Sequence, residues 1–152
     1  MEIKDSGNRT EFESGAVRDM KGEEKGRMDL MPLEVVAKVM MDDMVVKNIA
    51  QFMRDGDTKL LYCAIENIRD NAFGEDEIKM LLEVGIHFQQ GAMKYGENNW
   101  KKGIPAWSYI DSALRHYMKW WRGDNDEPHA RAAVWNLMCC IWELDYSDRA
   151  KG

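Results

Sequence analysis

The fold class is decided by residues 105–144, which read PAWSYIDSALRHYMKWWRGDNDEPHARAAVWNLMCCIWEL. Apolar side chains recur there every three or four residues, which is the spacing of one buried helix face. In the first half these residues are Trp107, Ile110, Leu114, Tyr117 and Trp121. After Gly123, Pro128 opens a second run with Ala133, Leu137, Ile141 and Leu144. The pattern predicts two helices joined by a short acidic turn.

Three more helices are predicted on the N-terminal side of this pair. Their approximate ranges are 32–54, 58–73 and 76–95. Thr58 is a candidate cap for the second, and Ile78, Leu81 and Leu82 share the apolar side of the third. No alternating run is long enough to predict a strand. The sequence therefore predicts an all-α fold of about five helices over residues 32–150.

Residues 1–31 differ in composition, with many glycines and charged residues and few apolar ones. Such a stretch cannot build a core of its own, so we expect an extended N-terminal arm. Its cations are Arg9, Arg18, Lys21, Lys25 and Arg27. Flexible glycines beside guanidinium groups suit phosphate contacts, because Arg binds phosphate oxygens in a bidentate fork. A disordered tail has the same composition.

Length and charge limit the classes of function. A chain of 152 residues with 45% hydrophobic residues predicts one domain with a real core. Twenty-seven acidic against 21 basic residues give a net charge of −6, which disfavours nucleic acid polymers as partners. No segment resembles a signal peptide or has transmembrane length, and the three cysteines form no disulfide pattern. We expect a cytoplasmic protein without membrane partners.

Two patterns in the predicted C-terminal helix pair contain candidate catalytic or metal-binding residues. Asp124, Asp126 and Glu127 place three carboxylates within four residues, and hard cations such as Mg²⁺ prefer such ligands. Exposed acidic caps at helix starts have the same composition, and the two interpretations are compatible.

The second pattern is a polar stripe of His129, Asn136 and Glu143, which recur every seven residues. The stripe fits a pocket wall or a solvated helix face equally well. Asp111 and Arg115 lie four apart and predict a surface ion pair, while His116 should point elsewhere on that helix.

Five short strings carry a family resemblance. They are GAVRD (15–19), KGRMDLMP (25–32), GAMKYG (91–96), NWKKG (99–103) and ALRH (113–116), followed by Asp126, Glu127, His129 and the pair Trp135–Asn136. In this order they resemble phage and bacterial dATP/dGTP diphosphohydrolases, within the MazG-like all-α nucleotide pyrophosphohydrolases. The resemblance covers the arm and residues 88–137, whereas residues 38–87 match nothing recognised.

The resemblance implies hydrolysis of dATP or dGTP to the monophosphate and pyrophosphate, with Mg²⁺ or, alternatively, Mn²⁺ or Co²⁺. The broader superfamily holds its metal on paired ExxE and ExxD helical motifs, and this pair is absent here. We therefore assign the metal to Asp124, Asp126 and Glu127, with Asp111 or Glu83 helping from another helix. Glu127, Asp126 and His129 are the expected catalytic residues.

The matching strings also indicate substrate contacts. For phosphate we expect Arg18, Lys25, Arg27, Lys94 and Arg115. As pocket or metal-orienting groups we expect Tyr95, Asn99, Trp100, His116 and Asn136. The superfamily also implies a homo-oligomer. Two other classes stay open, a non-catalytic nucleotide sensor and a small acidic interaction protein, whereas the absence of a His-Asp dipeptide disfavours an HD-type phosphohydrolase.

Overall fold

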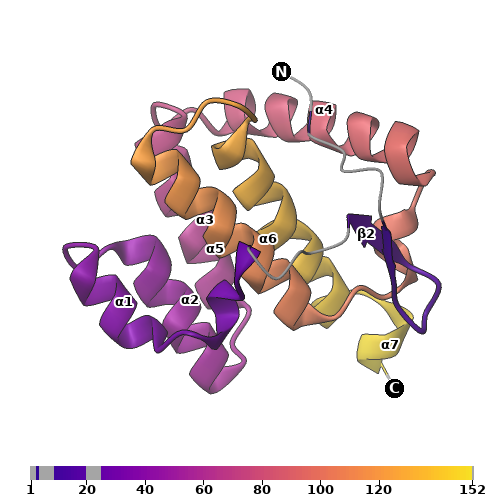
Figure 1. Ribbon diagram of the computed structural model, residues 1–152, viewed down its shortest axis with the longest axis horizontal. Coiled ribbons are helices and arrows are strands. Elements are labelled where there is room, and N and C mark those ends of the chain that lie inside the picture. Colours follow the sequence, from indigo (N-terminus) through magenta and orange to yellow (C-terminus); the bar gives the residue numbers. More distant parts are fainter. Residues whose placement is uncertain (1–2, 4–8, 20–24, 152) are drawn as a thin grey trace.

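The computed structural model describes residues 3, 9–19 and 25–151, and it is helical apart from one small hairpin (Figure 1). Lys21 and the neighbouring part of the predicted arm lie outside the described residues. The α-helices are α1 (Leu33–Val39), α2 (Met44–Asp55), α3 (Lys59–Ala72), α4 (Glu77–Tyr95), α5 (Ala106–Arg122), α6 (His129–Asp145) and α7 (Asp148–Lys151). The described residues also include the 3₁₀ helices η2 (Met28–Leu30) and η3 (Asn99–Lys102). The all-α class is confirmed, and no helix within these ranges is long and apolar enough to cross a membrane.

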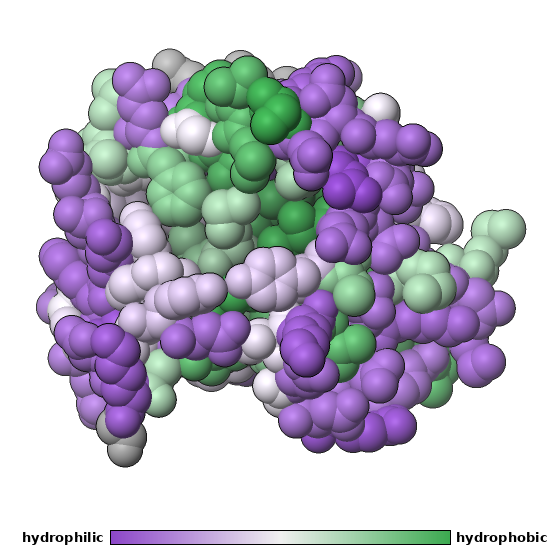
Figure 2. Space-filling model, turned by 180° about the vertical axis from the view of Figure 1, so that it is seen from behind, coloured by the Kyte–Doolittle hydropathy of each residue, from purple (hydrophilic) through white to green (hydrophobic). Residues whose placement is uncertain are grey.

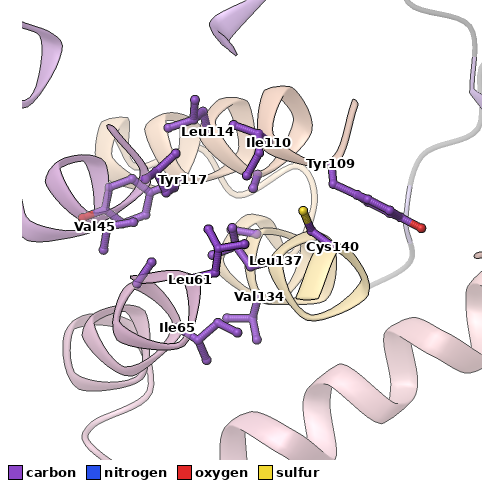
Figure 3. Packing of buried hydrophobic residues seen from close by; sticks show 14 of the residues in the cluster. Val45, Leu61, Ile65, Tyr109, Ile110, Leu114, Tyr117, Val134, Leu137 and Cys140 are labelled. Atoms are coloured by element: carbon purple, nitrogen blue, oxygen red, sulfur yellow. The ribbon is translucent and has the colours of Figure 1, made fainter. Parts of the chain in front are cut away.

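The central unit is the predicted pair α5 and α6. Gly123 ends α5 in the left-handed region at φ +90°, which glycine adopts at little cost. Pro128 then precedes α6, as the sequence predicts. Figure 3 shows Ile110 and Leu114 of α5 facing Leu137 of α6, with side chains of α2 and α3 completing the core. The buried face of this pair is therefore the one that helical spacing predicts.

The single helix predicted over residues 32–54 is wrong, because the chain forms α1 and α2 there. Met41 and Asp42 take left-handed φ values of 60° and 61°, which no continuous right-handed helix contains. Asp43 then caps α2, since its Oδ2 accepts a hydrogen bond from Val46 N at 2.9 Å. The predicted Thr58 cap is also absent: the Thr58 hydroxyl donates to Asp145 Oδ2 instead.

The apolar side predicted for α4 faces outward rather than into the core. Ile78 and Leu82 are 62% and 70% exposed, and Figure 2 shows apolar side chains gathered at the upper edge of the molecule, where α4 lies. The buried residues of α4 are instead Met80, Val84 and His87. The reason is that α4 packs mainly against α6 alone, so only a narrow stripe is covered.

The arm is not simply extended, because part of it forms a hairpin. The strand β1 (Arg9–Glu11) pairs antiparallel with β2 (Val17–Asp19), with Thr10 opposite Arg18. Asn99 of η3 fixes β2: its Oδ1 accepts from Val17 N at 2.9 Å, and its Nδ2 donates to Val17 O at 2.7 Å. The hairpin thereby lies against the loop that precedes α5.

Candidate functional site

A pocket of about 840 Å³ opens between α4, α5, α6 and the arm. The C-terminal half of α4 and the loop after it supply one wall, and α5 with the start of α6 supplies the other. The wall residues from α4 and its loop include His87, Phe88, Gly91, Lys94, Tyr95, Glu97, Asn99 and Trp100. Those from the opposite wall and the arm include Arg18, Lys25, Ser112, Arg115, His116, Lys119, Asp126, Glu127, Trp135 and Asn136. The pocket therefore joins segments more than 100 residues apart.

The charged lining is mixed, with more cations than anions. The cations are Arg18, Lys25, Lys94, Arg115 and Lys119, and the acids are Glu97, Asp126 and Glu127. Four of these five cations were predicted as phosphate contacts. The fifth predicted contact, Arg27, lies outside the lining: it pairs with Asp29 at 2.8 Å and stacks 3.9 Å from the Trp107 ring centroid. Such a lining attracts a polyanion and leaves carboxylates beside it.

Arg18 is the cation held most firmly. Its Nη2 donates to Asn136 Oδ1 at 2.7 Å, and its guanidinium lies 5.3 Å from the Tyr109 ring centroid. Burial lowers the pKa of Arg18 from its ordinary value, with Tyr109 acting in the opposite direction. An arginine keeps its charge regardless, so these neutral contacts orient a cation toward the pocket.

Two histidines and one carboxylate form a chain at the acidic end of the pocket. His116 Nδ1 lies 3.0 Å from His129 Nδ1, and His129 Nε2 lies 2.7 Å from Asp126 Oδ1. The short turn between α5 and α6 explains the contact, because it folds the two helices back on each other. Burial, and then the neighbouring His129, lower the pKa of His116 well below its ordinary value. The imidazole of His116 is therefore neutral near pH 7.

Side chains at this end form two overlapping groups with the chemistry of metal ligands. One contains His116, Glu127 and His129, the other Asp124, Asp126 and His129, and the ligand atoms within each group lie within 4.8 Å of one another. Asp124 is turned toward Arg122, whose Nε donates to its Oδ1 at 2.8 Å, and this hydrogen bond lowers the pKa of Asp124.

Asp111 belongs to neither group. It is fully buried, and its Oδ1 accepts from Arg115 Nη2 at 2.7 Å and from Met28 N at 2.7 Å. The predicted surface ion pair is thus a buried one. Arg115 also donates to Gly26 O at 2.9 Å, so the pair fixes the second half of the arm against α5.

Several other predicted site residues line the pocket and also make contacts that stabilise the fold. Asn99 holds the hairpin, and Asn136 holds Arg18. Trp100 packs edge-on against Phe88, with ring centroids 5.4 Å apart. Tyr95 and Lys94 lie together at the end of α4.

The proposed polar stripe of α6 has its members in two places. His129 lies in the histidine chain and Asn136 holds Arg18, beside the pocket. Glu143 lies further along the helix and pairs with Arg149 at 2.6 Å.

Sequence reasoning missed His87, Lys119 and the aromatic wall formed by Phe88 and Trp135. Lys119 had a usable signal, since it follows Arg115 by four residues and therefore shares its helix face. His87 had none. Its Nδ1 accepts from Arg131 Nε at 3.2 Å, and burial, followed by the charge of Arg131, lowers the pKa of His87 to about 3.

Comparison with known families finds a match in the C-terminal half of the chain. Residues 77–150 match the family described as dATP/dGTP diphosphohydrolase, N-terminal. The predicted resemblance is thereby confirmed. The matched segment holds α4, α5 and α6, which build most of the pocket. Neither a curated protein nor a solved structure matches the chain significantly.

Proposed function

We propose that the protein hydrolyses dATP or dGTP to the deoxynucleoside monophosphate and pyrophosphate, with a divalent metal ion. The observation that carries this proposal is one pocket in which five cations lie beside an acidic turn and two histidines. The family match supports the choice of a purine deoxynucleotide.

The dimensions and lining of the pocket support a nucleotide ligand. Its volume of about 840 Å³ lies within the range of small-molecule and cofactor sites. Arg115, His116 and Lys119 of α5 all line the pocket together with Asp126 and Glu127, so phosphates bound by the two cations lie near the acidic turn. Phe88 and Trp135 offer an apolar wall, with ring centroids 5.7 Å apart, for the base.

The acidic turn fits a divalent ion in its chemistry. Asp126 and Glu127 line the pocket, and Asp124 lies within reach of Asp126. We propose that these carboxylates hold Mg²⁺, for which Mn²⁺ or Co²⁺ can substitute. When bound, such an ion neutralises phosphate charge and lowers the pKa of bound water. Asp111 contributes from a distance, because it positions Arg115.

The remaining steps belong to side chains of the chain itself. Glu127 accepts a proton from the water that attacks the α-phosphorus, and the bond to the β-phosphate oxygen breaks, which releases pyrophosphate. Arg18, Arg115 and Lys119 neutralise the oxygens that gain charge in this step. Asp126 orients His129, and His129 in turn fixes the ring of His116 in the pocket wall, where the α-phosphate reacts.

The test is a nucleotide panel with the purified full-length protein. Each deoxynucleoside and ribonucleoside triphosphate is incubated with Mg²⁺, Mn²⁺ or Co²⁺, and products are followed by anion-exchange chromatography and a pyrophosphate assay. We expect dAMP or dGMP with one equivalent of pyrophosphate. No turnover with any metal, or release of orthophosphate alone, would contradict the proposal.

A nucleotide sensor is the second candidate, because the paired acidic motifs of the superfamily are absent. In that case dGTP raises the melting temperature in a thermal-shift assay and is recovered intact. Absence of a shift with every nucleotide would exclude this alternative.

A further inference from the structure

The histidine chain has a tautomeric order that follows from its contacts. Asp126 Oδ1 lies 2.7 Å from His129 Nε2, and an ionised carboxylate only accepts, so Nε2 carries the proton of His129. His129 Nδ1 is then unprotonated and carries a lone pair. It points at His116 Nδ1, which lies 3.0 Å away.

A carboxylate that accepts from one nitrogen of an imidazole is the usual partner of a metal-ligating histidine, because it fixes the ring and the tautomer. The other nitrogen is then free for the ion. Asp126, His129 and the lone pair of Nδ1 have this arrangement, and His129 is 2% exposed. A solvated acidic turn does not require it.

The separations fit a common ligand shell. Two nitrogens that each lie about 2.1 Å from one ion, at right angles or tetrahedral angles, are themselves about 3.0–3.4 Å apart. The two Nδ1 atoms are 3.0 Å apart, and a Glu127 carboxylate oxygen lies within 4.8 Å of a ring nitrogen of each histidine. His116 and Glu127 also line the pocket, so further coordination positions face a bound ligand.

We infer that His116, His129 and Glu127 form a two-nitrogen, one-oxygen site for a first-row transition-metal ion, with Asp126 as its positioning residue. Imidazole suits such ions, whereas Mg²⁺ prefers oxygen ligands and retains its waters. The inference rests on the proposed metal requirement and changes its ligands: two histidines replace Asp124 and Asp126. When the ion binds to His116 Nδ1, the proton of this nitrogen moves to Nε2. The imidazole is neutral before and after this shift.

Direct metal binding tests the inference without substrate. Untagged apo protein is titrated with Co²⁺ and, separately, with Mg²⁺, by calorimetry and visible absorption. We expect one Co²⁺ per chain, with ligand-field bands and a Kd at least tenfold below that of Mg²⁺. His116→Gln and Glu127→Gln should remove the bands. Asp126→Asn, which keeps an acceptor oxygen, should retain them and weaken binding roughly 10–100-fold.

His87→Gln is the matched control, because His87 lines the same pocket but belongs to neither metal group. Its Co²⁺ affinity should equal that of the wild type. The wild-type chain gives a second reading that does not depend on variants folding. It has three histidines, and substoichiometric Co²⁺ should broaden or shift the ring proton signals of His116 and His129 before those of His87.

Equal affinity for Co²⁺ and Mg²⁺, loss of binding in His87→Gln, or no selective effect on His116 and His129 would overturn the inference. These outcomes are separable from failure of the proposed function. If Mg²⁺ supports hydrolysis but Co²⁺ binding does not depend on the histidines, the inferred metal site is wrong and the proposed reaction stands. If Co²⁺ binds at the histidines but no nucleotide is hydrolysed, the proposed reaction is wrong and the metal site stands.

Discussion

Acidification should destabilise this fold through His87. The ring is buried on α4, its Nδ1 accepts from Arg131, and its centroid lies 5.4 Å from that of Trp135. A proton on His87 would place a second cation beside Arg131 and remove the acceptor. Burial, and then Arg131, therefore lower the pKa of His87 to about 3 in the folded protein.

The sign and size of the effect follow from proton linkage. In the unfolded chain His87 titrates near its ordinary pKa of 6.5, so as the pH falls the unfolded state takes up the proton first. The stabilisation is complete above about pH 7 and is lost progressively between pH 6.5 and 3. At pH 5 the loss from this residue amounts to about 2 kcal/mol of the free energy of unfolding.

The assay is urea unfolding at pH 8, 7, 6 and 5, followed by tryptophan fluorescence in the presence of EDTA. His87→Gln is the comparison, because the glutamine amide offers Arg131 an acceptor but does not titrate. The difference in unfolding free energy between wild type and variant should change by about 2 kcal/mol across this range. Contributions of the carboxylates are common to both proteins and cancel, and the effect of the His87 charge on the pKa of His116 is part of the measured difference. Parallel curves would refute the reasoning.

The remaining predictions concern the site, the arm, the core and the surface. Glu127→Gln should abolish nucleotide hydrolysis while circular dichroism stays unchanged; wild-type turnover would exclude the acidic turn from the mechanism. Deleting residues 1–27 removes Arg18 and should raise KM for dGTP roughly tenfold or more. An unchanged KM would show that the arm does not contact substrate. Leu137→Ala should lower the free energy of unfolding by about 2–5 kcal/mol, because Leu137 is fully buried. A loss below about 1 kcal/mol would mean that the core refills the space. The predicted homo-oligomer is tested at the exposed face of α4: Leu82→Glu should reduce the mass measured by light scattering without changing α-helical content, and an unchanged mass would exclude that face.

The helices that sequence analysis predicted well have both a strong period and a clear stop. α5 combines apolar residues at helical spacing with Gly123, and α6 follows Pro128 in the same way. Local sequence decides such elements, because propensity, capping and burial favour the same conformation. The face of α4 was predicted wrongly for the opposite reason: its apolar residues surround much of the helix, and packing against α6 selects Met80 and Val84.

The break between α1 and α2 and the hairpin of the arm could not be predicted. Met41 is not a residue that usually marks a left-handed turn, and one aspartate, Asp42, does not mark a turn by itself although Asp tolerates this conformation. The capping role of Asp43 becomes visible only once the break is known. Each strand has three residues, too few for an alternating pattern to appear. The hairpin depends on Asn99, more than 80 residues away, so no local signal reports it.

The candidate site was predictable in chemistry but less so in geometry. Its acidic turn and most of its cations carry local or family signals. Only the packed structure shows that Asp111 pairs with Arg115, or that His116 Nδ1 contacts His129 Nδ1. Helical spacing places neighbours on one helix, whereas contacts between helices depend on the turn that joins them.

The boundary of the family match bears on how the pocket works. The matched segment begins at residue 77, yet Arg18 enters the pocket from the arm and hydrogen-bonds Asn136 inside that segment. Asn99, also within it, binds both polar groups of the Val17 backbone. A side-chain amide that satisfies an N–H and a C=O of one residue fixes the register of β2, and with it the position of Arg18. The family segment thus carries the docking site for a cation supplied from outside it, so Asn99→Ala should weaken nucleotide binding through Arg18 although Asn99 itself need not touch the substrate.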